Sequence, residues 1–96
     1  MINTKNLTNA IESAAGCITR NDTIGALRIY QDILHSFPGN ADAYAGIGYA
    51  RALRQEFAEA IKSYINALRL RRQDEWMLDL AHVYINCRET IAARAA

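Results

Sequence analysis

The chain is short of the residue types that would place it in several common classes. Its 96 residues include two cysteines, one proline and five glycines. Two cysteines are too few for a disulfide-rich secreted scaffold. So little proline and glycine also disfavours a β fold with many turns, whereas abundant alanine, leucine and arginine favour helices. We therefore expect an all-α protein.

The chain also lacks a charge excess and a long apolar run. It has 11 Lys+Arg against 10 Asp+Glu, a formal net charge of +1, which argues against a dedicated nucleic-acid or anionic-membrane binder. Polar residues interrupt every apolar run before the roughly 18 residues that a membrane span needs. The polar opening segment is not typical of a signal peptide. These features predict one cytoplasmic domain over residues 1–96.

Residues suited to catalysis or metal binding are isolated from one another. Cys17 and Cys87 have no second cysteine or histidine at metal-ligand spacing, so both are expected to be reduced, buried or half-buried thiols. His35 and His82 have no nucleophile or carboxylate at a spacing that indicates a catalytic pair. The sequence therefore predicts no enzyme activity, no cofactor and no metal.

An internal repeat gives the clearest sign of organisation. A shift of 34 residues aligns small and aromatic residues in pairs: Ala14 with Gly48, Ala26 with Ala60, and Tyr30 with Tyr64. Pro38-Gly39-Asn40 interrupts the helical pattern, and Asn40 is suited to cap the next helix. The pattern predicts helices over 4–19, 23–36, 41–54, 57–70, 74–86 and 89–95, with no strand.

The middle of the chain resembles a tetratricopeptide repeat. That family's 34-residue pattern is W-x₂-L-G-x₂-Y…A-x₃-F…P, and its positions are matched here by Tyr44, Ile47, Gly48, Ala60, Tyr64 and Ala67. Arg51 stands where the family has tyrosine, and Arg72 where it has proline. The resemblance implies a single-layer helical-hairpin solenoid of about two and a half repeats, at about 7–40, 41–73 and a truncated 74–96.

In this family the first helix of each repeat lines an inner groove that holds the ligand. Helical spacing separates two stripes on segment 41–54, one expected to pack on 57–70 and the other expected to face the groove. The groove residues expected from the second stripe and its counterparts are Ile11, Ala15, Ile18, Ala45, Tyr49, Ala52, Leu53, Leu78, His82 and Ile85. This lining is almost wholly apolar, which suits an amphipathic helix of a client protein. The alternative is that some of these residues bury one another in a tight superhelix.

The resemblance implies a non-enzymatic protein-binding module. A very small cytoplasmic chain with an apolar groove is similar to the tetratricopeptide chaperones of bacterial type III secretion, which hold export subunits unpolymerised, often beside a second small helical protein. Two alternatives stay open. One is a self-associating structural scaffold, and the other, less favoured, is a nucleic-acid adaptor.

Three further features have both a structural and a functional interpretation. Arg69, Arg71 and Arg72, together with Arg51 and Arg54, are expected to form one basic cluster. The cluster could simply complement helix dipoles, or it could contact an acidic partner or phosphates. For Trp76, core packing is favoured over a role as an interface anchor. The alanine-rich C-terminal end lacks a polar cap, so a partner or a second copy of the chain is expected to cover it.

Overall fold

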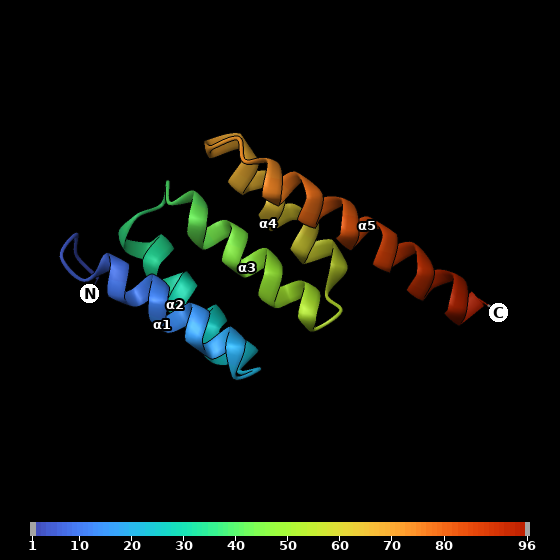
Figure 1. Cartoon of the computed structure of the whole chain (residues 1–96), viewed down its shortest axis with the longest axis horizontal. Coiled ribbons are helices and arrows are strands. Elements are labelled where there is room, and N and C mark those ends of the chain that lie inside the picture. Colours follow the sequence, from blue (N-terminus) through green and yellow to red (C-terminus); the bar gives the residue numbers. More distant parts are fainter. Residues whose placement is uncertain (1, 96) are drawn as a thin grey trace.

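The computed structural model describes residues 2–95; Met1 and Ala96, the outermost residues of the predicted domain, lie outside the described part. The chain folds into five helices: α1 (Leu7–Thr19), α2 (Thr23–Ser36), α3 (Ala41–Leu53), α4 (Phe57–Leu70) and α5 (Asp74–Ala95). Consecutive helices pack as antiparallel hairpins. Figure 1 shows α1, α3 and α5 side by side, with α2 and α4 behind them. The all-α prediction is confirmed.

Local side-chain chemistry explains where the helices begin. The side chain of Asp22 accepts a hydrogen bond from the Gly25 N–H at 3.0 Å, and Asn40 accepts one from the Ala43 N–H at 2.8 Å. Each bond satisfies a backbone donor that the first turn of a helix leaves unpaired. The expectation that Asn40 caps the third helix is confirmed.

The helix bounds recur at an offset of 34 residues. Adding 34 to the bounds of α1 and α2 gives the bounds of α3 and α4. The turn within each hairpin recurs too, because Asn21 and Gln55, again 34 apart, both adopt a φ of 61°. A non-glycine residue in the left-handed region is uncommon, so the shared value shows that both hairpins turn in the same way.

Tyrosine rings packed on glycines hold neighbouring helices close together. A Cβ placed on Gly48 would lie 2.8 Å from the Tyr64 ring, and one on Gly46 would collide with the Tyr30 ring. Tyr64 is only 1% exposed and Tyr30 is 6% exposed. Tyr30 reaches α3 from α2, and Tyr64 reaches it from α4. The middle helix is therefore clamped from two sides by aromatic rings that only glycine leaves room for.

The C-terminal third differs from the prediction. Segments 74–86 and 89–95 were expected to be two helices, but they form one continuous helix, α5. The chain between them, Cys87-Arg88, contains no glycine or proline, so nothing interrupts the helical hydrogen bonds. At about 33 Å, α5 is half as long again as α4. Its C-terminal half extends beyond the rest of the molecule (Figure 1).

The start of α1 is also later than predicted. The helix begins at Leu7 rather than at residue 4. Asn3 and Asn6 explain the difference, because each side chain accepts a hydrogen bond from the other residue's backbone N–H, at 2.7 and 3.1 Å. These bonds satisfy the backbone in a turn and compete with helix formation.

Gly46→Ala should destabilise the fold. Alanine gains helix propensity, but its methyl group collides with the buried Tyr30 ring, and overpacking of this kind costs about 1–3 kcal/mol. Gly39→Ala is the control, because a Cβ there meets nothing within 4 Å. Thermal unfolding should give a lower midpoint for Gly46→Ala and a nearly unchanged one for Gly39→Ala. Equal midpoints would contradict the close packing of the Tyr30 ring against Gly46.

Candidate functional site

A continuous hollow runs between α3 and α5 and is floored by α4. It consists of three adjoining pockets of about 260, 190 and 630 Å³. Tyr49, Tyr64 and Asp79 line both the first and the second pocket, while Ala52, Leu53 and Asn86 line both the second and the third. Because neighbouring pockets share their walls, we treat them as one site, the α3–α5 groove.

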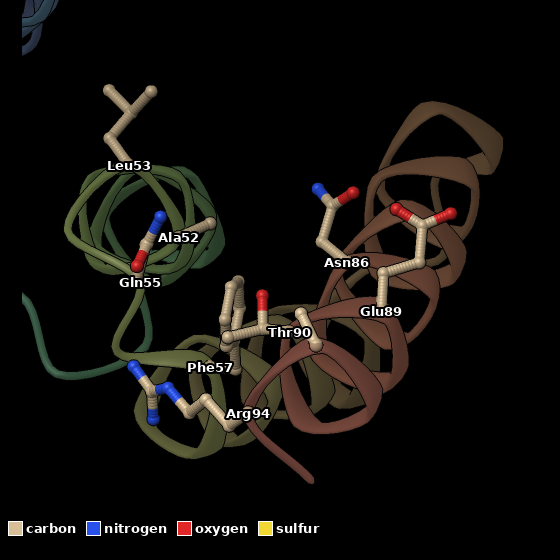
Figure 2. Close-up of a pocket in the computed structure, with 9 residues that line it drawn as sticks. Ala52, Leu53, Gln55, Phe57, Asn86, Glu89, Thr90 and Arg94 are labelled. Atoms are coloured by element: carbon tan, nitrogen blue, oxygen red, sulfur yellow. The ribbon is translucent and has the colours of Figure 1, made fainter. Parts of the chain in front are cut away.

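The two walls of the α3–α5 groove differ in chemistry. The α3 wall is mainly apolar and presents Ala45, Tyr49, Ala52 and Leu53, with Asp42 at its N-terminal end. The α5 wall is more polar. Asp79, His82, Asn86 and Glu89 follow one another along it at helical spacing, and the buried side chains of Trp76 and Val83 reach the same pockets from its core side. Figure 2 shows the wide end of the groove, where Asn86 on α5 points across the opening toward α3 and Phe57 lies on the floor between them.

Burial shifts the pKa values of two groups in the groove. It raises the pKa of the Asp79 carboxyl above the ordinary value, and the nearby charge of Glu75 raises it further, whereas His82 lowers it. Burial also raises the pKa of the Tyr64 hydroxyl, with the Asp79 charge adding to the rise. Burial is the larger cause of both shifts, and it disfavours a charge of either sign. Only the smaller part of each shift, from the charges of Glu75 and Asp79, is a repulsion that a nearby cation would relieve.

Six of the ten groove residues predicted from the sequence line this site. They are Ile11, Ala45, Tyr49, Ala52, Leu53 and His82. Tyr49 and Leu53 are each 47% exposed, while Ala45 is buried. The alternative of mutual burial thus describes Ala45 but not the two larger side chains.

The other four predicted residues lie elsewhere. Ile18 packs against the core cluster around α1 and α2, and Ala15 is exposed on α1 without lining the groove. Leu78 is exposed on α5 outside the groove, and Ile85 lines a separate hollow with Arg88. On α5 the predicted stripe was rotated by about one residue, which is about 100°.

The rotation of the predicted α5 stripe explains why the sequence analysis did not identify the polar residues of the α5 wall. The groove face predicted on α5 consists of Leu78, His82 and Ile85, of which the structure places only His82 at the pockets, beside Asp79 and Asn86. A signal for the correct orientation exists in the sequence. Trp76, Leu80 and Val83 form an apolar stripe that packs into the core with α4, and the polar wall is the adjacent stripe.

The arginines do not form the single basic cluster that was expected. Arg51 and Arg54 lie at the end of α3, where both guanidinium groups are 3.0 Å from a carboxylate oxygen of Glu56. Arg71 pairs instead with Asp42 at the start of α3, at 2.6 Å. Twelve helical residues, about 18 Å, separate these two ends. Because Arg51 and Arg54 lie far from Arg71, and because carboxylates of Glu56 and Asp42 pair with them, these arginines give little support to a nucleic-acid site.

Other predicted features have clear positions. Trp76 is 6% exposed, and the Arg71 guanidinium lies 4.8 Å from its ring centre, so the core-packing interpretation is confirmed. Cys17 is buried and Cys87 half-buried, and both thiols are free. Residues 2–95 contain no cluster of three or more side chains that could hold a metal ion. None of the helices described here is both long and apolar enough to cross a membrane.

Comparisons with known proteins add no further constraint. Neither the models of known protein families nor the curated proteins contain a match to this chain. The function of the α3–α5 groove is therefore inferred from its own geometry and chemistry.

Asp79→Asn should stabilise the protein near neutral pH. Because the folded-state pKa of Asp79 is raised, its ionised form costs stability, and that cost grows as the pH rises from the ordinary carboxyl value of about 4 through the raised value. Asparagine removes the charge. Thermal unfolding near neutral pH should show a midpoint higher by no more than a few degrees.

The same comparison at a pH below the ordinary carboxyl value provides the control, because both side chains are then uncharged. There the two midpoints should coincide. Arg51 and Arg54 lower the pKa of Glu56, so its stabilising contribution is lost as the pH falls. That loss affects both proteins equally. A lower midpoint for Asp79→Asn near neutral pH would contradict the assignment.

Proposed function

We propose that this chain is a non-enzymatic protein-binding module that holds an amphipathic helix of a partner protein in the α3–α5 groove. The observation that carries the proposal is the pair of unlike walls, mainly apolar on α3 and more polar on α5. A helix with one apolar face and one polar flank matches such a surface, since its anchors recur every three to four residues.

The size of the groove suits a short helix. Its α5 wall extends from Asp79 to Ala93, and the fourteen helical steps between them span about 21 Å. A guest helix of about four turns spans that length. The exposed rings and methyl groups of Tyr49 and Leu53 then supply the apolar contacts, and aromatic side chains of this kind often dominate binding energy.

The charged residues of the groove indicate which charge the polar side of the bound helix should carry. Asp79 and Glu89 line the α5 wall, and neither belongs to an ion pair among the described residues; the one cation of this wall among those residues, Arg94, lies at its C-terminal end. Burial and Glu75 already disfavour the Asp79 anion. A lysine or arginine on the guest relieves this cost, because an opposite charge stabilises the ionised form. The proposed guest is therefore a helix whose polar flank is basic.

Within this function, we propose a tetratricopeptide-type chaperone. The 34-residue recurrence of helix bounds and turns supports the repeat identity. The exposed apolar wall supports a role in covering a client helix, as the small chaperones of type III secretion do. A self-associating scaffold is the second candidate, and it is favoured by a different surface, on the outer side of α5.

Peptide binding tests the groove. A synthetic leucine-lysine amphipathic peptide of about four turns should bind, and a leucine-glutamate peptide of the same pattern should bind at least about tenfold more weakly, because like charges oppose each other across the α5 wall. Fluorescence anisotropy of labelled peptides measures both affinities. Equal binding of the two peptides would contradict the charge assignment.

Tyr49→Ala should weaken binding of the leucine-lysine peptide by about tenfold or more, because it removes the largest exposed side chain of the apolar wall. Ile24→Ala is the matched control, since Ile24 is 59% exposed but lies on α2, away from the groove. Circular dichroism of both variants should match that of the parent. If Ile24→Ala weakens binding as much as Tyr49→Ala, the α3–α5 groove is not the site.

A further inference from the structure

The outer side of α5 carries an exposed apolar stripe that no other helix covers. Met77, Leu78, Tyr84 and Ile85 are 46%, 59%, 47% and 52% exposed. At 100° per residue these side chains, together with Ala81, fall within about 120° of the helix circumference. This α5 stripe lies on a different side of the helix from the core residues Trp76, Leu80 and Val83, and it borders the groove wall at Glu89.

Comparison with α3 shows what is missing at the α5 stripe. Ala43, Ile47 and Ala50 of α3 pack in a core cluster with residues of α2, and the residues 33 positions later, Trp76, Leu80 and Val83, pack in the same way with residues of α4. The neighbouring side of α3, about 100° around the helix, is covered by α4, whose Tyr64 ring contacts Gly48.

The position that corresponds to Gly48 on α5 is Ala81, and Tyr44 corresponds to Met77. Both Ala81 and Met77 are exposed. In the part of the chain that the structure describes, no helix follows α5 to cover them. Among residues 2–95 the α5 stripe is thus an uncovered surface of the kind that packs against another helix.

We propose that the α5 stripe pairs with the α5 stripe of a second copy of this chain, in an antiparallel arrangement whose two-fold axis passes near Ala81. A small residue at the axis allows the two helices to approach closely. Met77 and Ile85 lie four residues on either side of Ala81, and Leu78 and Tyr84 lie three residues on either side. In the antiparallel pair each apolar side chain therefore meets an apolar side chain of the other copy.

The charges on the stripe fix this register. Asp74 and Arg88 lie seven residues before and after Ala81, within the same sector of the helix, and both are exposed. Neither belongs to an ion pair among residues 2–95. In the antiparallel pair Arg88 of each copy lies opposite Asp74 of the other, so one dimer contains two ion pairs. A partner helix must place a cation opposite Asp74 and an anion opposite Arg88. An antiparallel copy of α5 does so with its own Arg88 and Asp74.

Charge reversal tests both the dimer and its register. Sedimentation equilibrium of the full chain over a concentration series should show a monomer–dimer equilibrium. Asp74→Arg and Arg88→Asp should each raise the dissociation constant about tenfold or more, because each creates two like-charge contacts in a dimer of identical chains. Arg94→Asp is the control, since Arg94 lies outside the stripe and should leave the constant unchanged.

Combinations of the variants give the decisive result. The double variant Asp74→Arg/Arg88→Asp restores opposite charges and should dimerise like the parent. An equal mixture of the two single variants should also dimerise, because each chain then meets its complement. A parent chain that stays monomeric would overturn the proposal and leave the stripe to a helix of a different protein. A dimer insensitive to both single reversals would overturn it too.

Discussion

The fold depends on close packing of tyrosine rings against glycines of the middle helix. Tyr30 reaches Gly46 from one side and Tyr64 reaches Gly48 from the other. A helix pair of this size buries few large side chains, and alanine makes up much of the core. Close approach of the backbones compensates for that small volume, because dispersion contacts fall off steeply with distance. The positions of α2 and α4 around α3 follow from these two contacts.

The same packing leaves one side of the molecule open. Although they contact α3 from two flanks, α2 and α4 both lie in the layer behind α1, α3 and α5 (Figure 1). The residues that α3 and α5 present toward each other in front of α4 are therefore left uncovered. The α3–α5 groove is the result. Its apolar wall is the stripe of α3 left over after the tyrosine contacts are made, and its polar wall is set by how Trp76 and Val83 orient α5 against the core.

Much of the fold was predictable from the sequence. The helix starts at Thr23 and Ala41 follow from the capping residues Asp22 and Asn40, and the bounds 57–70 follow from apolar periodicity, since these signals are local. The α3 wall was predictable too, because its stripe sits beside a repeat pattern with two glycines. On α5 the prediction failed for a physical reason: which stripe faces the groove depends on the packing of Trp76, a contact that is not local.

The proposed site can be tested most directly by locating a bound peptide on the protein. A leucine-lysine amphipathic peptide with a nitroxide label at its centre should broaden the backbone amide NMR signals of Tyr49, Leu53 and Asn86, which surround the middle of the groove. Signals of α2, such as that of Ile24, should stay sharp. Broadening centred on α2, or spread evenly over the surface, would contradict the account.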